Sequence, residues 1–346
     1  MLSIVAALLV FGLIVLIHEF GHFLFAKLGG IAVDEFSIGM GPRIASFKRG
    51  GTRYSLKIFP FGGSCMMRGE DEANKDPEAF NNKPVWTRIK VIAAGPVFNF
   101  LLAFVFACLI IGFTGYDPAK VADVVPGYPA AEAGLEAGDT ITHINGKRMY
   151  VYRDVQNYIM FHPGKSLEVE YERNGQEHSA LIAPKYSEEN GGYLMGITGG
   201  IYTPAENIVE TVKYGAYEVV YWIKMVVKSL SMIFQGQVTR DDIAGPVRIV
   251  AIIDSTVEQS TPYGLGVVLL QLANLTVLLS ANLGVMNLLP IPALDGGRLV
   301  FLIIEALRGK PVDPEKEGMV HLTGMALLMT LMIFILFNDI SNLFMS

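Results

Sequence analysis

Two histidines and a glutamate near the start of the chain have the types and spacing of a zinc-dependent hydrolase. The run His18-Glu19-Phe20-Gly21-His22 has the form H-E-x-x-H. Residues four apart share one face of a helix, so both imidazoles can bind one zinc ion while Glu19 lies beside the bound water as a general base. Chance produces this motif in about one chain in a hundred of this length. The motif alone therefore indicates zinc hydrolysis without establishing it.

A catalytic zinc ion needs a third protein ligand and an open position for water. Asp295 is the strongest candidate, because it follows an apolar run in which Pro290 and Pro292 must stop or kink a helix. Such a break at membrane depth is tolerated only where protein or a water-filled cavity surrounds it. Capping of a helix over residues 297–307 by Asp295 fits the spacing equally well. The other histidines have no evident partner: His143, His162, His178 and His321.

Composition excludes several other classes of protein. Hydrophobic residues make up 51% of the 346 residues and charged residues 17%, against roughly 25% charged in an ordinary soluble domain. A net charge of −6 argues against a nucleic-acid binder, which needs a basic face. Two cysteines, Cys65 and Cys108, are too few for a disulfide framework or a thiolate metal site. A metal ion here must be held by histidine and carboxylate.

Four apolar stretches are long enough to cross a bilayer, which takes about 20 residues. They are residues 2–26, 91–116, 264–294 and 318–338. The first contains the H-E-x-x-H motif, and charged groups inside a span cost roughly 2.5 to 3.5 kcal/mol each and are rarely present without a use. This stretch has no basic n-region and no A-x-A site, so we expect it to stay attached rather than to be a signal peptide. The sequence predicts an integral membrane protein.

Basic residues in two loops predict the orientation of these spans. They are Arg43, Lys48, Arg49, Arg53, Lys57, Arg68, Lys75 and Lys83 in one loop, and Arg298, Arg308, Lys310 and Lys316 in the other. Both loops are predicted to lie inside, which places both termini and the long segment after the second span outside. Residues 203–236 form a helical pattern with one lysine-bearing face. We expect this helix to lie in the membrane interface, and a crossing by residues 208–235 remains the alternative.

Residues 118–186 predict a small soluble α+β domain of short alternating strands and turns. Within them, residues 129–146 (PAAEAGLEAGDTITHING) resemble the PDZ signature of bacterial protease-associated domains. The turns of that signature fall at Gly134, Gly138, Asp139, Asn145 and Gly146. The resemblance implies capture of peptide termini by strand addition. A spacer domain with a disused groove is the alternative.

The motifs together resemble the site-2 protease family of intramembrane zinc metalloproteases. H-E-x-x-H lies in the first span, N-x-x-P-x-P-x-x-D-G-G ends the third, and a PDZ-like domain lies between them. The likeness covers nearly the whole chain and is closest to the bacterial regulator-of-sigma-E protease branch, in a form with one PDZ domain instead of two. It implies that His18, His22 and Asp295 bind Zn²⁺ and that Glu19 is the catalytic base. A size-filter role that depends on tandem PDZ domains does not carry over.

Further matches to this family imply residues that handle substrate. They are Gly95 and Asn99 in the second span, Asn282 and Asn287 near the aspartate motif, and Tyr54, Leu56 and Ile58 in a membrane-associated β segment. A substrate helix must be unwound before cleavage, because its carbonyls are held in hydrogen bonds four residues apart. The alternating residues 54–59 could pair with the unwound substrate as an edge strand. An inner-side hairpin without substrate contact is the alternative.

The predicted protein is a membrane α-helical protein of four transmembrane helices, with a β segment at 43–63 and an inserted PDZ domain. The predicted parts are the first half of the membrane core (1–117), the PDZ domain (118–186), a linker with an interfacial amphipathic helix (187–262) and the second half of the membrane core (263–346). The resemblance implies a zinc metalloendopeptidase of the bacterial inner membrane that cuts single-span membrane proteins, such as anti-sigma factors or remnant signal peptides. A PDZ-bearing membrane scaffold or chaperone with a vestigial zinc site is the alternative, although structural zinc would not need Glu19. A transporter fits less well, because no inverted repeat is seen.

Overall fold

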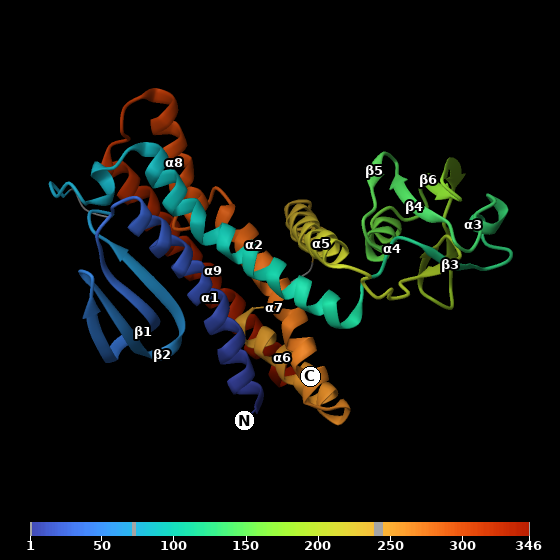
Figure 1. Ribbon diagram of the computed structural model, residues 1–346, viewed down its shortest axis with the longest axis horizontal. Coiled ribbons are helices and arrows are strands. Elements are labelled where there is room, and N and C mark those ends of the chain that lie inside the picture. The colour runs from blue at the N-terminus through green and yellow to red at the C-terminus, as the bar shows by residue number, and fades with distance from the viewer. Residues whose placement is uncertain (1, 71–73, 239–244, 346) are drawn as a thin grey trace. The chain divides into compact units, whose positions relative to one another are not determined.

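The computed structural model describes residues 2–70, 74–238 and 245–345, and its chain divides into two compact units (Figure 1). The first unit comprises Met1–Phe106 and Trp222–Ser346, and the second comprises Ala107–Tyr221. Two long helices, α2 (Val85–Thr114) and α5 (Ile208–Phe234), contribute to both units. Residues 71–73 of the predicted inner loop and 239–244 of the predicted linker lie outside the described residues.

The first unit is mainly helical. Besides parts of α2 and α5 it contains α1 (Leu2–Leu28), η1 (Phe80–Asn82), α6 (Pro246–Ser260), η3 (Thr261–Tyr263), α7 (Leu265–Leu288), α8 (Asp295–Arg308) and α9 (Pro314–Met345). In the described chain, four helices are long and apolar enough to cross a membrane: Ile4–Leu28, Val85–Thr114, Leu265–Leu288 and Lys316–Ser341. These four confirm the predicted membrane helical protein. The predicted amphipathic helix forms as α5 and is not one of the four.

The third predicted span is interrupted where its prolines require. Helix α7 ends at Leu288, residues 289–294 turn, and α8 begins at Asp295. Proline cannot donate the backbone hydrogen bond that a helix interior needs, so Pro290 and Pro292 exclude a continuous helix. Small residues let the turn fold back on α8, because a Cβ at Gly296 would lie 2.1 Å from Leu289 O.

Helix α6 has no counterpart in the predicted elements. Its residues, Pro246–Ser260, fall within residues 187–262, for which the sequence predicts a linker with one interfacial helix at 203–236. In the structure its apolar face packs against the start of α1 and of α7. Ile253 and Val257 are buried there with Ala6, Ala7 and Val268. One face of this short helix therefore packs into the helical unit, and the rest of its surface is largely exposed.

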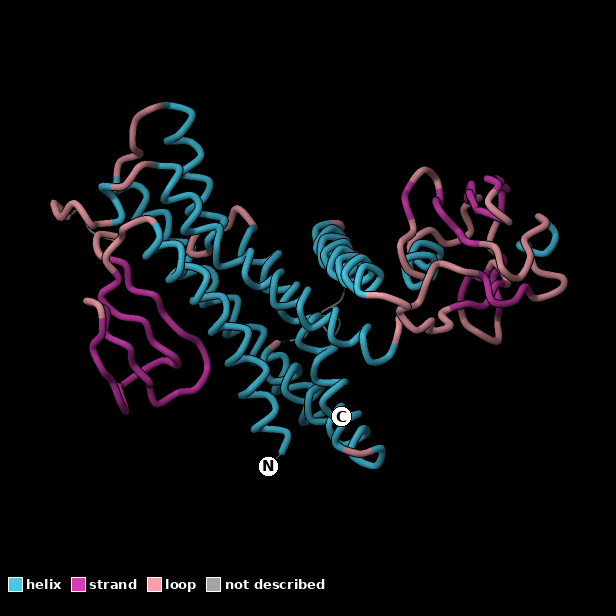
Figure 2. The backbone as a smooth tube through the Cα atoms, in the orientation of Figure 1, coloured by secondary structure: helices cyan, strands magenta, loops and turns pink. Residues whose placement is uncertain are grey.

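A bent β ribbon lies along α1 (Figure 2). Strands β1 (Val33–Arg49) and β2 (Thr52–Met67) bend so that residues 35–38 pair on one side with 53–56 and on the other with 63–66. Residues 53–56 pair in addition with 45–48. The ribbon begins ten residues before the predicted segment at 43–63. Aromatic contacts of Phe23 with Phe36 and Tyr54 fix it to α1.

The second unit is an α+β fold built on alternating strands. It contains β3 (Val121–Val124), α3 (Pro129–Glu132), β4 (Thr140–Ile144), β5 (Lys147–Arg148), α4 (Tyr152–Met160), β6 (Leu167–Arg173), β7 (Gln176–Ile182), β8 (Lys185–Ser187), β9 (Gly192–Leu194) and β10 (Ile197–Gly199). One sheet has the order β5-β4-β6-β7. Alternate residues of β6 face the core, where Leu167 and Val169 are fully buried.

The second unit extends past the predicted boundary at residue 186. Strand β10 pairs with β3, with Ile197 opposite Val124, and Met195 belongs to the buried core. The first half of α5 also belongs to this unit, because Arg153 bridges Asp117 and Glu218 at 3.1 and 2.6 Å. Strands of only three residues carry too little alternation to be recognised in a sequence. The boundary drawn at residue 186 is therefore too early.

Candidate metal centre

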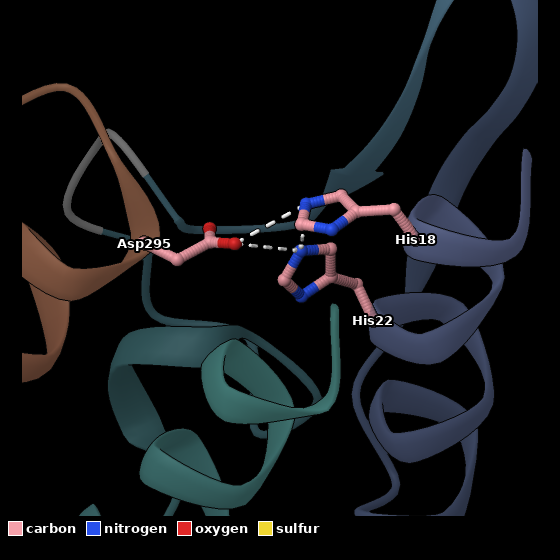
Figure 3. Close-up of side chains that lie close together, drawn as sticks. All are labelled: His18, His22 and Asp295. Atoms are coloured by element: carbon pink, nitrogen blue, oxygen red, sulfur yellow. Dashed lines mark hydrogen bonds and ion pairs between the residues drawn. The ribbon is translucent and has the colours of Figure 1, made fainter. Parts of the chain in front are cut away.

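Helix α1 presents its two motif histidines side by side. The rings of His18 and His22 meet edge to face with centroids 4.8 Å apart, and their Nε2 atoms are 3.3 Å apart. Both side chains are buried, at 8% and 6% exposed. The four-residue spacing on a helix produces this arrangement directly. Figure 3 shows both imidazoles projecting from α1 toward Asp295.

Asp295 completes a triangle with the two imidazoles. Its Oδ2 lies 3.2 Å from His18 Nε2 and 3.4 Å from His22 Nε2. The residue that caps α8 is Leu294, and Asp295 is the first residue inside the helix. The capping alternative is therefore wrong, because the carboxylate faces the histidines instead of the helix N–H groups.

The three facing atoms fit the geometry of a zinc ion. With zinc–ligand bonds of 2.0 to 2.1 Å and tetrahedral angles, neighbouring ligand atoms lie about 3.3 Å apart. The observed separations of 3.2, 3.3 and 3.4 Å match that value. Asp295 Oδ2 is buried and receives no hydrogen bond from the described residues. Two imidazoles and a carboxylate also leave a fourth position open, as catalytic zinc sites do.

The Nδ1 atom of His22 has a hydrogen-bond partner that determines which ring nitrogen carries the hydrogen. His22 Nδ1 lies 2.9 Å from the backbone oxygen of Val91 on α2. A carbonyl oxygen only accepts, so Nδ1 carries the hydrogen and the lone pair of Nε2 faces the triangle. A ligand histidine bound to a backbone carbonyl in this way is held in the tautomer and orientation that metal binding needs.

Helix α2 makes room for the histidines at Gly95. A Cβ at this position would lie 2.2 Å from His22 Nε2 and 2.9 Å from His18 Cε1. One turn further on, Asn99 is fully buried and its amide Nδ2 lies 3.1 Å from His18 Nδ1. Both residues are predicted to handle substrate, and that role stays a prediction. The structure places them against the histidines, where Gly95 supplies space and Asn99 contacts the ring.

Glu19 is partly buried and lies beside the β ribbon. A Cβ at Gly63 would approach Glu19 Cγ to 3.0 Å, so the strand segment 63–67 passes next to this side chain. The segment pairs with residues 33–38 on one side. The carboxylate of Glu19 is not one of the three clustered ligand groups, and its role as a base stays a prediction.

The predicted edge strand is wrong. Tyr54 and Leu56 pair on both sides, with Phe36 and Ile38 in one direction and with residues 45–47 in the other. A strand hydrogen-bonded on both sides has no free edge to offer a substrate. Alternation of side chains is the same in edge and central strands, so the sequence could not separate them. Ile58 lies further along the same run and is 52% exposed.

The two asparagines predicted near the aspartate motif both lie in α7. Asn282 and Asn287 are partly buried in that helix, and their role in substrate handling stays a prediction. Sequence reasoning missed two groups that support the site. Ser280 Oγ donates to Asn99 O at 2.8 Å, and His321 Nδ1 accepts from the N–H of Ala293 at 3.0 Å. No motif marks such contacts, because they join distant helices.

Comparison with known proteins gives one matching family model and many relatives. The family model described as "Peptidase family M50" matches residues 6–331. The chain is 34% identical over 425 residues to the zinc metalloprotease RasP of Geobacillus kaustophilus, covering 99% of each chain. It is 32% identical over 428 residues to the regulator of sigma-W protease RasP of Bacillus subtilis, again covering 99% of each.

Solved structures similar to part of the chain include the PDZ domain of an SdrC-like protein from Listeria monocytogenes. The sequence identity is 29%, the match covers 24% of this chain and 88% of that one, and the TM-score is 0.23.

Proposed function

The chain belongs to peptidase family M50, and we propose that His18, His22 and Asp295 hold its catalytic zinc ion while Glu19 acts as the general base. The resemblance to site-2 proteases predicted from the motifs is confirmed by the family match and by the names of the relatives. The protein is an intramembrane zinc metalloprotease. The scaffold alternative is not favoured, because full-length relatives are named as proteases.

The single observation that carries the assignment of the ligands is the triangle of Nε2, Nε2 and Oδ2 atoms with sides of 3.2 to 3.4 Å. Zinc, when bound, lowers the pKa of its water toward about 7 and polarises the scissile carbonyl. Helix α1 fixes the two imidazoles, and the turn before α8 brings the carboxylate to them from the other side. Glu19, one residue after the first ligand, accepts the proton of the attacking water and passes it to the leaving amine.

Substrate is proposed to bind as an added strand beside Glu19. The segment 63–67 pairs with β1 on one side, and its first residue, Gly63, lies next to the Glu19 side chain. An extended substrate there would exchange its helical hydrogen bonds for bonds to this strand. Residues 63–67, rather than the doubly paired residues 54–56, are the proposed place of strand addition. Single-span membrane proteins, anti-sigma factors among them, are the proposed substrates.

The second unit is proposed to be a PDZ domain that binds peptide termini. A groove of about 780 Å³ lies between α4 and the segment 190–198. Its apolar lining includes Ile159, Met160 and Tyr193. Strand β10 pairs with β3 along one edge, and a peptide laid in the groove could pair with the other. Gly196 adopts a φ of +81°, which suits the tight turn that enters β10.

We propose that the protein lies in the bacterial cell membrane with the PDZ domain and both termini outside. Helix α5 is proposed to lie in the interface. Within the second unit it meets α2 closely, because a Cβ at Gly215 would lie 2.5 Å from Cys108 Sγ. Cys108 lies inside the apolar helix, six residues before its end at Thr114. The first half of α5 therefore lies beside apolar residues of a span, which favours partial burial in lipid.

Metal analysis combined with a cleavage assay tests the proposal. The wild type and Glu19→Gln, both purified in detergent, are compared for zinc content and for cleavage of a single-span test substrate. We expect equal zinc content and loss of cleavage in Glu19→Gln, because the amide cannot take a proton from water. Substitution of a second carboxylate away from the site, Glu258→Gln, should change neither quantity. Retained cleavage in Glu19→Gln would show that Glu19 is not the general base. Absence of zinc from the wild type would contradict the proposed zinc site.

A further inference from the structure

Asn99 of α2 is the one side-chain amide in the described residues that contacts a proposed zinc ligand. It is fully buried, and its Nδ2 lies 3.1 Å from His18 Nδ1. Its Oδ1 is buried too and has no hydrogen-bond partner among the described residues. One end of this amide therefore faces an imidazole, and the oxygen at the other end accepts no hydrogen bond from the described residues.

The end that faces the ring decides whether His18 can bind a metal ion. If the amide N–H₂ donates to Nδ1, the neutral imidazole carries its hydrogen on Nε2, the atom that faces Asp295. A nitrogen that carries a hydrogen has no lone pair for a metal. If the amide oxygen faces the ring instead, Nδ1 carries the hydrogen and donates it to Oδ1. The lone pair of Nε2 is then free.

The two orientations of the amide fill nearly the same volume. They differ by a rotation of 180° that exchanges Oδ1 and Nδ2. In the orientation as drawn, Oδ1 at the far end has no hydrogen-bond partner among the described residues, so that end gives this orientation no support. The ring does decide, because only the orientation with Oδ1 toward Nδ1 leaves His18 able to join the triangle. His22 already shows the corresponding arrangement, with its Nδ1 against the oxygen of Val91.

We propose that Asn99 is a positioning residue whose Oδ1 accepts a hydrogen bond from His18 Nδ1 and so fixes the tautomer and orientation in which His18 binds zinc. The inference rests on the proposed zinc site. A hydrogen bond from Ser280 Oγ of α7 to Asn99 O, at 2.8 Å, helps to fix the backbone at Asn99. Gly95, one turn earlier, has no side chain, and this leaves space for the rings of His18 and His22.

Two substitutions of similar size separate accepting from donating. Aspartate at position 99 can only accept when ionised, and leucine can do neither. We expect Asn99→Asp to bind zinc at least as tightly as the wild type, because carboxylates commonly play this role toward zinc-bound histidines. We expect Asn99→Leu to bind zinc about 10- to 100-fold more weakly. Affinity is measured on the full-length protein in detergent by competition with a chelator of known affinity.

A spectroscopic readout separates positioning of the ligand from general stability. The Co²⁺-substituted wild type and Asn99→Asp should give the same intense tetrahedral absorption bands, whereas Asn99→Leu should give weaker bands as one ligand is lost. Asn157→Leu removes an amide from the second unit, where Asn157 donates to Tyr221, and should leave zinc affinity and bands unchanged.

The outcomes separate this inference from the proposed zinc site. If the wild type binds zinc and Asn99→Asp loses affinity as Asn99→Leu does, the amide acts as a donor and the inference is wrong. Unchanged affinity in Asn99→Leu would also overturn it. If Asn99→Leu does not fold, the comparison of Asn99→Asp with the wild type still decides. Absence of zinc from the wild type would contradict the site itself.

Discussion

His321 on α9 accepts a hydrogen bond through Nδ1 from the backbone N–H of Ala293, at 3.0 Å. Ala293 has a φ of +76°, a conformation that a residue with a Cβ adopts only at a cost in free energy. It lies two residues before Asp295 in the turn that brings the carboxylate to the histidines. Gly324 on α9 also meets this turn, because a Cβ there would lie 2.3 Å from Pro292 Cβ. Helix α9 therefore stabilises the turn that positions Asp295, the third proposed ligand.

Substitution of His321 should weaken zinc binding without touching a ligand. His321→Phe keeps an aromatic ring beside Phe301, whose centroid is 5.6 Å away, but leaves the N–H of Ala293 without its acceptor. We expect zinc affinity to fall about tenfold. Adding Ala293→Gly should restore part of the loss, because glycine adopts a positive φ without support. Equal affinity of the wild type and His321→Phe in a chelator competition would show that the contact does not position Asp295.

The ligands themselves should behave as a set. We expect His18→Ala, His22→Ala and Asp295→Ala each to lose most of the bound zinc, because two remaining protein ligands hold the ion far more weakly than three. Asp295→Asn, which keeps the shape and loses the charge, should bind zinc at an intermediate level. Zinc per protein is measured by elemental analysis after dialysis. Full occupancy in Asp295→Ala would remove Asp295 from the proposed ligand set.

Local spacing made one half of the site predictable. The four-residue repeat of a helix places His18 and His22 on one face whatever surrounds them, and the prolines after α7 required the break that precedes Asp295. The meeting of these two segments was available only from the family resemblance, because nothing local joins α1 to α8. The capping alternative could be discarded only when the structure showed Leu294 in the capping position.

Other features depend on contacts between distant segments. The pattern of residues 54–59 does not show whether a strand segment has one neighbour or two, so the sequence predicts an edge in the wrong part of β2. Asn99 was recognised from a motif, but its contact with His18 arises from the packing of α2 on α1. Helix α6 was missed because its apolar face is short and is covered by other helices. In each case the local pattern can be recognised in the sequence, but the structural role depends on a distant segment that packs against it.

Disulfide crosslinking tests the strand segment 63–67 as the place where substrate binds. Cys65 lies in this segment and is a free cysteine. In a Glu19→Gln, Cys108→Ser protein it should couple to a substrate cysteine placed near the cleavage site. The control has Cys65→Ser and Phe47→Cys, because Phe47 lies on the far side of the ribbon and is 63% exposed. Coupling at position 47 with none at position 65 would reverse the assignment of the edge.

The second unit should lose stability in acid through Asp139. Burial alone would raise the pKa of this carboxyl, but the Arg173 guanidinium and the backbone N–H of Glu136 lower the pKa below its ordinary value. The unfolded chain therefore takes up the proton at a higher pH than the folded chain does. The stabilisation is fully present above the ordinary carboxyl pKa of about 3.9 and is lost as the pH falls through the lowered folded pKa.

Substitution of Asp139 tests this relationship. Asp139→Asn should lower the free energy of unfolding of the second unit by about 3 kcal/mol at pH 7, because Arg173 loses a buried partner. It should also flatten the dependence of stability on pH below 4. Asp123→Asn changes an exposed aspartate of the same unit and should leave both unchanged. Urea unfolding of the full-length variants, followed by hydrogen exchange in β4 and β6, gives both quantities. A pH dependence in Asp139→Asn equal to that of the wild type would contradict the assignment.

Asp339, near the end of α9, caps the helix that the sequence did not reveal. Its side chain is 4% exposed, and its two oxygens accept hydrogen bonds from the N–H groups of Gly245, Val247 and Arg248, each at 3.1 Å. These groups begin α6, where a negative charge also interacts favourably with the helix dipole. A Cβ at Gly245 would lie 2.5 Å from Asp339 Oδ2, so this glycine permits the close approach.

Loss of this cap should loosen α6 and, with it, the packing of the start of α1. We expect Asp339→Ala to destabilise the protein by about 2 kcal/mol, the upper end for loss of a cap, because three N–H groups lose their acceptor. Asp339→Asn keeps one accepting oxygen and should lose less. Thermal unfolding in detergent gives the order of stability, and hydrogen exchange locates the change in α6. Thr330→Ala, which removes only a hydroxyl bonded within α9, is the control. If Asp339→Ala matched this control in both measurements, the cap would contribute nothing and the packing of α6 against its neighbouring helices would hold it in place.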